Sequence, residues 1–184
     1  LRLESTYGQE IENPLWDNSY DTRDAFAYHP DGKAKIVLDA QPIMDLDLSS
    51  RLVDGALILP DGAYESMDGI EFSKSKLEKY ISANWLDRKQ AKKNTVWQIM
   101  ARNKQLLSEY SDYVFSKVNE RHKVNLAMTL YKGNKSKLPT MRLWYLGTLD
   151  DGSDAGCDTF LNDNESRLMG KYKSYTLEEI MAPR

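Results

Sequence analysis

The segment AFAYHPDGKAKIVL, residues 25–38, holds two short apolar runs on either side of a Pro-Asp-Gly turn signal. Proline presets φ at the first turn position, aspartate hydrogen-bonds its own backbone, and glycine accepts a positive φ. Two apolar runs joined in this way predict a β-hairpin. Because the same tripeptide recurs at residues 60–62 behind another apolar run, we expect antiparallel hairpins over residues 25–67.

The next part of the chain changes to a helical pattern. Over residues 73–122 the apolar side chains recur every three or four positions, which indicates helices. Asp87 followed by Gln90 fits a helix N-terminus with a capping box. One long helix or two helices with a break near Ser111 fit the segment equally well. Its apolar stripe, residues 96–118, is expected to face the core, or to form a dimer seam if the helix projects.

The pattern then returns to a period of two. Apolar and polar residues alternate over 124–131 and again over 141–146, and the connection between them contains Gly and Pro. This pattern predicts a second hairpin over residues 124–149. Strands, helices and strands in this order favour an α+β fold with two antiparallel hairpins around a helical centre. We expect one domain over the whole chain, with residues 1–24 as an irregular N-terminal arm because they lack periodicity.

Composition is typical of a soluble globular protein. The chain has 184 residues, of which 41% are hydrophobic and 29% charged. No apolar run reaches the roughly 18–20 residues that span a bilayer, so we expect no membrane partner and a cytoplasmic location. Cys157 is the single cysteine, which excludes an intramolecular disulfide framework and a cysteine-based zinc site. We expect it to be an inert loop residue, and we assign no cofactor and no metal.

Charges are distributed unevenly along the chain. Residues 88–142 hold 13 Lys and Arg against 3 Asp and Glu, a net charge of +10, whereas residues 1–87 carry −9 and residues 143–184 carry −4. Such a basic segment can contact phosphates, and aromatic side chains beside it can stack on bases. We therefore predict a surface that binds an anionic partner such as nucleic acid. Its candidate residues are Arg88, Lys89, Lys92, Lys93, Lys132, Lys135, Lys137, Arg142 and Trp144.

A second interpretation of the basic segment needs no anionic partner. In this interpretation the helix faces are solvated, and the cations pair with carboxylates of the acidic first third. Positive charge in the first turn of a helix opposes the helix dipole by about a few tenths of a kcal/mol per residue. The cations at residues 88–93 are therefore unfavourable there unless something else favours them. Whether they remain unpaired in the folded chain separates the two interpretations.

No set of residues supplies a nucleophile, a base and an oxyanion site together, so we predict a non-enzymatic interaction or assembly module. A protein partner or self-association is expected, with nucleic acid as the anionic candidate. The alternative function is a metal-dependent phosphodiester hydrolase that uses carboxylates of the β-rich N-terminal third, namely Asp39, Asp45 and Asp47. The acidic loop 150–165 offers oxygen atoms that calcium favours, but its spacing does not fit an EF-hand, and a solvated loop is expected.

Overall fold

A computed structural model of the protein contains both strands and helices. The structure describes residues 20–40, 51–53, 55–77, 84–120, 127–130, 136–149, 155–157 and 167–168. Helices and antiparallel strands are both present in these ranges, which confirms the predicted α+β class.

The strands are β1 (Tyr20–Tyr28), β2 (Ala34–Val37), β3 (Leu52–Val53), β4 (Ala56–Ile58), β5 (Ile70–Phe72), β6 (Asn84–Trp85), β7 (Ala127–Leu130), β8 (Thr140–Leu146), β9 (Ala155–Cys157) and β10 (Arg167–Leu168). The helices are α2 (Ala63–Ser66), α3 (Lys74–Leu77), α4 (Arg88–Lys93), α5 (Thr95–Ala101) and α6 (Lys104–Glu120).

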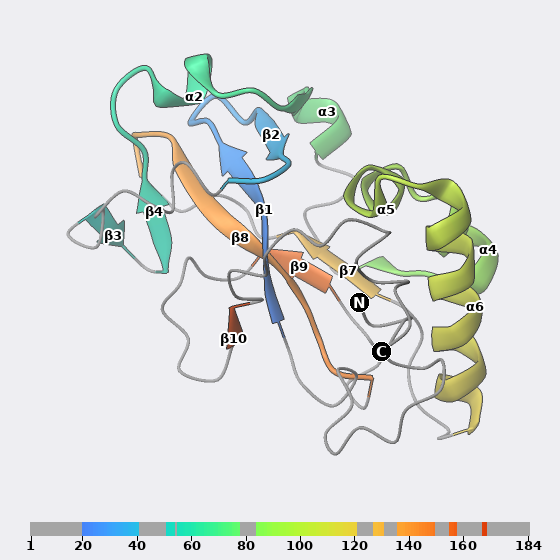
Figure 1. The fold of residues 1–184 in the computed structure, drawn as a ribbon. Helices are drawn as coiled ribbons and strands as arrows, with labels where there is room; N and C mark the ends of the chain where they lie inside the picture. Colours follow the sequence, from blue (N-terminus) through green and yellow to red (C-terminus); the bar gives the residue numbers. More distant parts are fainter. Residues whose placement is uncertain are drawn as a thin grey trace, which may run out of the picture.

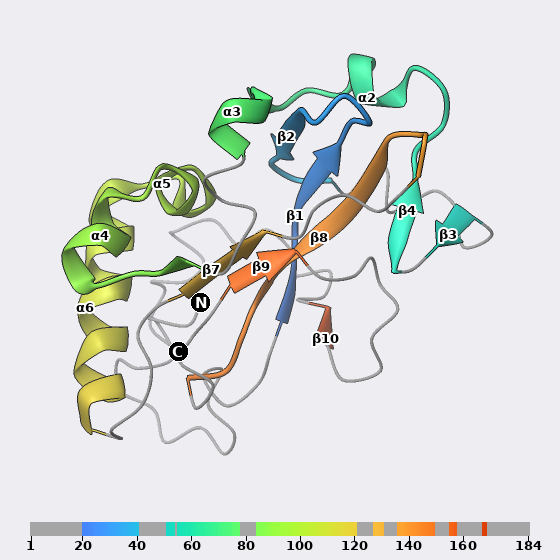
Figure 2. The same cartoon turned by 180° about the vertical axis from the view of Figure 1, so that it is seen from behind.

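The sheet is built around the long antiparallel pair β1 and β8 (Figure 1). Its strand order is β5-β2-β1-β8-β9-β7-β6, and β4 also pairs with β8 while β10 pairs with β1. Both views show α4, α5 and α6 grouped at one end of the molecule, whereas β3 and β4 lie at the opposite end (Figures 1 and 2). The sheet therefore has one end that carries three helices and one that carries short strands.

The first predicted hairpin is present. β1 pairs antiparallel with β2, and the turn between them holds Pro30, Asp31 and Gly32, the last with φ 91°. The Asp31 side chain accepts a hydrogen bond from the backbone of Lys33 at 3.0 Å, as the turn chemistry predicts. This hydrogen bond is the main reason why the pKa of Asp31 is lowered to about 2.

The second Pro-Asp-Gly signal leads into a helix instead. Gly62, at φ 73°, precedes α2, and Lys35 Nζ donates to the carbonyl oxygens of Tyr64 at 2.7 Å and Met67 at 3.2 Å. These contacts attach α2 to β2. Residues 52–53 and 56–58 form a short antiparallel pair of their own, β3 and β4, and β4 also pairs with β8. The hairpins expected over residues 25–67 are therefore two small pairs that both join the central sheet.

The strands predicted for residues 124–149 exist, but they do not pair with each other. β9 lies between them, parallel to β7 and antiparallel to β8, and β6 completes the edge beyond β7. A period of two in the sequence shows that a segment is a strand, but it does not identify the strand's partner. The partner of both strands is β9, which the chain forms later, at residues 155–157. Cys157 was expected in a loop, but it lies buried in this strand.

Helix α4 begins as the sequence predicts. The Asp87 side chain accepts a hydrogen bond from the Gln90 backbone at 2.7 Å, and the Gln90 side chain accepts one from the Asp87 backbone at 2.9 Å. This reciprocal pair is a capping box. Helix α3 begins at Lys74, one residue before Ser75, which together with Glu78 fits a capping box in the sequence.

The helical centre breaks at two places that lack glycine and proline. Extended Asn94 ends α4 and caps α5 by accepting a hydrogen bond from the Trp97 backbone at 3.0 Å. Left-handed Arg102, with φ 57°, ends α5. Ser111, where a break was considered, lies buried inside α6. Within the predicted helical segment, residues 74–77 and most of 88–120 are helical, but β6 at Asn84–Trp85 is a strand that the sequence did not predict. The corners between α4, α5 and α6 are set by two polar residues.

The N-terminal arm expected over residues 1–24 ends earlier than the sequence suggested. Residues 20–24 belong to β1, because Tyr20 and Asp21 pair with Leu146 and Tyr145 of β8. Their polar composition hides the strand from a search for apolar alternation. Residues 1–19 of the arm lie outside the described ranges. So do residues 43–48, whose alternation predicts a strand, and the segment from residue 176, whose capping box predicts a short helix.

Two hydrophobic clusters occupy the two faces of β1 and β8. The cluster toward α5 and α6 is aromatic and contains Phe26, Tyr28, Trp97, Phe115 and Trp144. The cluster on the other face is built from smaller side chains, Ala25, Ala27, Val37, Leu57, Leu59, Tyr64, Met141 and Leu143 among them. Alternation along β1 and β8 separates the two sets, since neighbouring side chains point to opposite faces.

Candidate functional site

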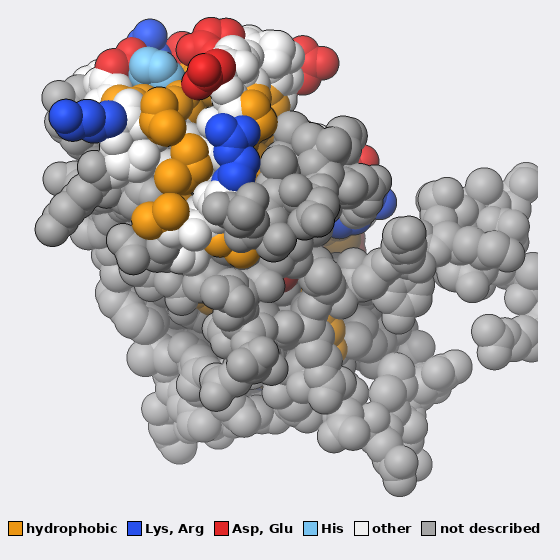
Figure 3. Space-filling model, turned by 90° about the vertical axis from the view of Figure 1, so that its left-hand side faces the viewer, with side chains coloured by type: hydrophobic (Ala, Val, Ile, Leu, Met, Phe, Trp, Pro, Cys, Tyr) orange, Lys and Arg blue, Asp and Glu red, His pale blue; other side chains and the backbone are white. Residues whose placement is uncertain are grey.

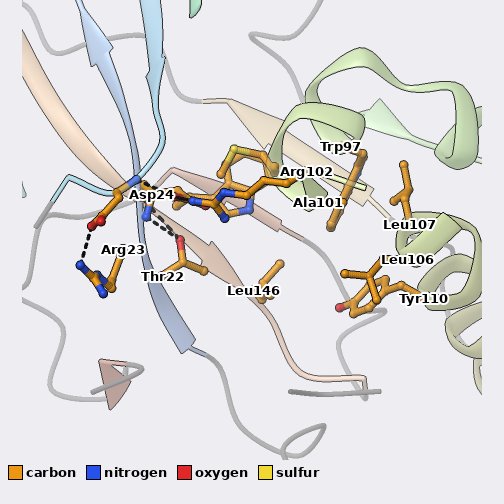
Figure 4. Close-up of a pocket in the computed structure, with 13 residues that line it drawn as sticks. Thr22, Arg23, Asp24, Trp97, Ala101, Arg102, Leu106, Leu107, Tyr110 and Leu146 are labelled. Carbon is orange, nitrogen blue, oxygen red and sulfur yellow. Dashed lines mark hydrogen bonds and ion pairs between the residues drawn. The ribbon is translucent and has the colours of Figure 1, made fainter. Parts of the chain in front are cut away.

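A cavity of about 450 Å³ lies between β1 and β8 and the corner that joins α5 to α6 (Figure 4). Its apolar lining comes from both helices and from β8, and its polar lining comes from β1, the residue after β2 and the helix corner. The lining residues are Thr22, Arg23, Asp24, Asp39, Trp97, Met100, Ala101, Arg102, Leu106, Leu107, Tyr110, Trp144 and Leu146.

A β-bulge supplies the polar residues of β1. Asp21 pairs with Tyr145 and Ala25 pairs with Leu143, so residues 22–24 of β1 lie opposite Trp144 alone. A bulge bends its strand and re-aims the side chains that it carries, and bulges are frequent beside functional sites. Here all three bulged residues, Thr22, Arg23 and Asp24, line the cavity.

The buried carboxylate of Asp24 joins three segments of the chain. Its Oδ1 atom accepts a hydrogen bond from the Asp39 backbone at 2.8 Å and another from Arg102 Nη2 at 2.7 Å. The Asp24 side chain is only 8% exposed, whereas that of Arg102 is 52% exposed. A buried carboxylate is costly unless it is paired and hydrogen-bonded. Arg102 therefore ties the corner of α5 and α6 to β1, as the close-up shows (Figure 4).

The two partners of Asp24 share an unusual backbone conformation. Asp39, at φ 65°, and Arg102, at φ 57°, are the residues other than glycine with positive φ in the described part of the chain. A residue with a Cβ atom pays roughly 1–2 kcal/mol for the left-handed region. Such strain persists where surrounding contacts hold it, and it often marks a functional site. Both strained residues lie at the same end of the cavity.

Charges at this end of the cavity are balanced. Arg102 pairs with Asp24, and Arg23 Nη2 lies 2.7 Å from Asp39 Oδ1. The Arg23 carbonyl also accepts a hydrogen bond from the Ala40 backbone at 2.6 Å, which anchors the segment after β2. Two cations and two anions thus form two ion pairs with no net charge. We refer to these four residues as the charged rim.

The opposite end of the cavity is aromatic. The Trp97 ring lies 6.0 Å from Trp144, edge to face, and 6.1 Å from Tyr110. Trp144 in turn stacks on Phe26 at 5.5 Å. Aromatic pairs in these arrangements contribute roughly 0.5–1.5 kcal/mol beyond the area they bury. The rings are therefore held in place before any ligand arrives.

Two of the residues predicted to bind an anion share one acidic partner within the protein. Arg88 and Lys92 both form ion pairs with Asp112 of α6, the second at 2.7 Å. The hydrogen bond from Lys92 is the main cause that lowers the pKa of Asp112. Asp112 therefore contacts two of the four cations of α4, although its single charge can neutralise only one of them. Arg102 pairs with the acidic first third, as the second interpretation expects.

Lys89 and Lys93 lie on a neighbouring face of α4, about 100° around the helix from Arg88 and Lys92. They are exposed and border a shallow hollow of about 350 Å³ together with Leu86, Gln90 and Asn94. No ion pair links either lysine to another residue of the described ranges. They are the two members of the predicted anion-binding set that the structure brings together without an acid.

The remaining predicted residues do not join them. Lys137 is exposed on the segment before β8, whereas Lys132 and Lys135 lie outside the described residues. At the end of the molecule that carries β3 and β4, basic side chains lie apart from one another among hydrophobic and acidic ones (Figure 3). Exposed Val53 belongs to β3 at this end.

Two predicted residues of β8 face the interior. Trp144 is 1% exposed and its ring is covered by Phe26 and Trp97, so it cannot stack on a base at the surface. Assigning it to a nucleic-acid surface was wrong, because the alternating pattern does not say which face is covered. Arg142 is half-buried, and its charge acts on buried Tyr28 and Cys157 within the sheet.

Cys157 has the environment of an inert thiol. It is fully buried in the aromatic cluster, and burial raises its pKa well above the ordinary value. Burial likewise raises the pKa of the Tyr28 hydroxyl. A thiol that stays protonated is a poor nucleophile, which agrees with the expectation of an unreactive cysteine.

The acidic residues considered for catalysis are tested in part. Asp39 is held in an ion pair with Arg23 at the charged rim. Asp45, Asp47 and most of the loop 150–165 lie outside the described residues. The hydrolase alternative therefore stays a prediction, as does the cytoplasmic location. None of the helices in the described ranges is long and apolar enough to cross a membrane.

Sequence reasoning identified the helical side of the cavity but missed the strand side. Met100, Leu107 and Tyr110 belong to the apolar stripe of the sequence, and all three line the cavity. Thr22, Arg23 and Asp24 carry no motif, because a bulge interrupts the alternation that reveals a strand. Their meeting with Arg102, 78 positions away from Asp24, follows from the fold.

Comparison with known proteins gives a likeness of fold. No protein-family profile matches the chain, and no curated protein matches its sequence. A solved structure described as "Accommodation of massive sequence variation in Nanoarchaeota by the C-type lectin fold" is similar over 84% of this chain and 78% of that chain. The TM-score is 0.51 and the sequence identity 13%. At this identity the likeness concerns the fold, which is similar to the C-type lectin fold.

Proposed function

We propose that the protein is a non-enzymatic binding module and that the cavity between β1, β8 and the α5–α6 corner is its ligand site. The observation that carries this proposal is the cavity itself, about 450 Å³ with an aromatic floor and a charged rim. Ligand pockets typically have roughly 300–1,000 Å³, mostly apolar walls and a few placed polar groups. The cavity has each of these properties.

Three independent features of the backbone support this assignment. The bulge at residues 22–24 and the strained residues Asp39 and Arg102 all lie at the same end of the cavity. A fold that needed only stability would place glycine at left-handed positions, where it costs less. Side chains kept there despite the strain fit a role in binding.

The fold neighbour is compatible with a binding role. That structure is described as a C-type lectin fold that accommodates massive sequence variation. A scaffold that keeps its fold while side chains vary suits a protein whose task is recognition. For this chain, function rests on its own site, because one fold can host many unrelated functions.

The proposal is tested with a neutral fluorescent probe, N-phenyl-1-naphthylamine. Saturable binding with one site per chain is expected. Leu106 lines the cavity and Leu138 does not, yet both side chains are 45% exposed. Leu106→Trp fills the cavity and is expected to weaken binding at least tenfold, whereas the matched control Leu138→Trp leaves the affinity unchanged.

Two results would contradict the cavity as the site. One is the absence of saturable binding to the unmodified protein. The other is an equal loss of affinity in both tryptophan variants, which would place the probe elsewhere or reflect unfolding. Thermal unfolding of both variants is recorded alongside, so that a change in stability is seen separately.

A second candidate role, binding of an anionic partner, now rests on Lys89 and Lys93 of α4. Like charges four residues apart on a helix are unfavourable by roughly 0.2–0.5 kcal/mol, and these two have no acid among the described residues. Together they border the small hollow. We keep nucleic acid as the anionic partner for this role.

A salt titration tests this second role with single-stranded oligonucleotide as the probe. Removing two phosphate contacts lowers the log–log salt slope by about 1.4. The double variant Lys89→Ala/Lys93→Ala is expected to show that change, while the control Lys76→Ala/Lys104→Ala retains the original slope. Absence of binding at low salt ends the proposal.

A further inference from the structure

The ion pair between Asp24 and Arg102 at the charged rim is asymmetric. The Asp24 side chain is 8% exposed, whereas that of Arg102 is 52% exposed. Oδ1 of Asp24 accepts hydrogen bonds from Arg102 Nη2 and from the Asp39 backbone, so two segments hold the carboxylate in place. Both residues line the cavity. The accessible member of the pair is therefore the cation and not the anion.

The guanidinium of Arg102 keeps most of its capacity to donate hydrogen bonds. An arginine carries five N–H donors in one rigid plane. Among the described residues, only Asp24 accepts a hydrogen bond from this group, and it does so from Nη2. The Arg102 side chain extends from the α5–α6 corner to Asp24 among the lining residues (Figure 4). Because half of the side chain is accessible, an acceptor in the cavity can reach the guanidinium.

Stability alone does not account for an arginine at this corner. An ion pair with a half-exposed cation contributes little to folding, and the left-handed backbone of Arg102, at φ 57°, is unfavourable for a residue with a Cβ atom. A group that binds a ligand, in contrast, needs neighbours that lock its orientation. The buried Asp24 carboxylate does this for the Arg102 guanidinium.

The two ion pairs of the charged rim together indicate the charge of the ligand. Arg23 and Asp39 are exposed to a similar degree, 47% and 53%, so their pair favours neither sign. The pair of Asp24 and Arg102 favours an anion, because its acid is buried. A guanidinium matches a carboxylate with two parallel N–H donors, and such charge-assisted hydrogen bonds are the strong ones. A carboxylate on the accessible side of Arg102 leaves the hydrogen bond to Asp24 intact.

The rest of the lining requires an apolar body beside this carboxylate. The aromatic floor of Trp97, Tyr110 and Trp144 faces the same cavity. We propose that the ligand is an apolar carboxylic acid, whose carboxylate binds the Arg102 guanidinium and whose hydrophobic part packs on these rings. This inference rests on the proposed function and names the class of ligand for the same site.

Three naphthalenes of similar size test the inference at neutral pH. 2-Naphthoate is an anion, 2-methylnaphthalene is uncharged and lacks an acceptor, and 2-(aminomethyl)naphthalene is a cation. Their affinities are measured by displacement of N-phenyl-1-naphthylamine from the unmodified protein. We expect naphthoate to bind about tenfold more tightly than the methyl compound, the lower end of the range for a hydrogen bond to a charged group, because Arg102 is half exposed. The amine is expected to bind more weakly than the methyl compound.

A conservative variant tests the role of the guanidinium. Arg102→Lys keeps a cation beside Asp24, but a single ammonium cannot donate to two carboxylates in one plane. Its preference for naphthoate over 2-methylnaphthalene is expected to fall below about threefold, with the affinity for the methyl compound unchanged. The control Lys104→Met removes a positive charge two residues away, outside the cavity lining, and is expected to keep the full preference.

Two further measurements keep the test independent of folding and of other basic sites. Thermal unfolding of each variant is recorded, and if Arg102→Lys does not fold, the order of the three affinities in the unmodified protein still tests the charge of the ligand. Leu106→Trp is expected to weaken naphthoate as strongly as it weakens the probe, whereas Leu138→Trp leaves both affinities unchanged. This pattern places the naphthoate inside the cavity.

The outcomes separate the ligand class from the proposed function. If the methyl compound or the amine binds as tightly as naphthoate, or if Arg102→Lys keeps the full preference in a folded protein, the ligand class is wrong while the cavity remains a binding site. The same conclusion follows if naphthoate is insensitive to Leu106→Trp. If the probe itself does not bind saturably, both the ligand class and the site are overturned.

Discussion

The two faces of β1 and β8 are built differently. One face carries small and aliphatic side chains such as Ala27, Met141 and Leu143, each fully buried. The other carries Phe26, Trp97 and Trp144 together with the cavity. Strand alternation separates the two sets of side chains. The bulge at residues 22–24 and the helices α5 and α6, which pack on the aromatic face, add to the contrast.

This contrast separates stability from function within one sheet. Filling the first face with interlocking aliphatic groups holds the strands together, since interiors are packed like organic crystals. The second face is packed less closely, because a cavity lies between its side chains. Proteins tend to break local rules at functional sites and compensate elsewhere. We expect substitutions on the first face to alter stability and those on the second to alter binding.

The largest expected effect is on the packed face. Leu143→Ala removes a fully buried side chain and leaves a void, which destabilises a protein by roughly 2–5 kcal/mol. Urea unfolding measures the loss. The affinity for N-phenyl-1-naphthylamine is expected to stay unchanged under native conditions. A stable variant with weakened binding would show that the two faces are not independent.

A matched pair of larger side chains sharpens the comparison. Ala27 is fully buried on the packed face, and Ala27→Leu is expected to cost roughly 1–3 kcal/mol through overpacking. Ala101 borders the cavity, so Ala101→Leu finds room and is expected to change stability by less than about 0.5 kcal/mol. It should nevertheless weaken probe binding. Equal destabilisation in both variants would contradict an open cavity.

The charged rim gives a smaller effect. Arg102→Ala leaves the buried Asp24 carboxylate without its cation and is expected to cost about 1–2 kcal/mol, discounted because Arg102 is half exposed. Arg102→Gly removes the same ion pair but relieves the left-handed backbone. It is expected to be about 1 kcal/mol more stable than the alanine variant. If the Arg102→Gly variant is no more stable than the Arg102→Ala variant, the backbone at residue 102 is not strained.

The smallest effect concerns the hairpin turn. The backbone hydrogen bond from Lys33 lowers the pKa of Asp31 to about 2, below its ordinary value of 3.8. Stability from this group is present above pH 4 and is lost as the pH falls from about 4 to 2. Asp31→Asn is expected to reduce the pH dependence of the free energy of unfolding between about pH 4 and pH 2, and not at other pH values. NMR titration of the carboxyl checks the pKa, and an ordinary value would contradict the turn geometry.

Local chemistry in the sequence predicted local structure well. The turn at residues 30–32 and the capping box of Asp87 and Gln90 are both present, because each depends on residues within three positions. The same holds for helices α4 to α6 and for the β7 and β8 strands. These features follow from propensities and short hydrogen bonds that any window of the chain contains.

Features that depend on distant pairing were not predictable. β9 inserts between β7 and β8 from residues 155–157, and nothing in the alternation of those two strands announces it. The bulge at residues 22–24 has no apolar pattern, and Arg102 takes a left-handed turn that sequence rules assign to glycine or asparagine. The site is built from these exceptions, which is why only its helical side was visible.

Two methionines report on the two faces in one measurement. Met100 lines the cavity, whereas Met141 is buried on the packed face. With carbon-13 in the methionine methyl groups, and signals assigned from Met100→Leu and Met141→Leu, the protein is titrated with N-phenyl-1-naphthylamine. We expect the Met100 signal to move saturably while the Met141 signal stays in place. A moving Met141 signal beside a stationary Met100 signal would contradict the assignment of the cavity as the ligand site.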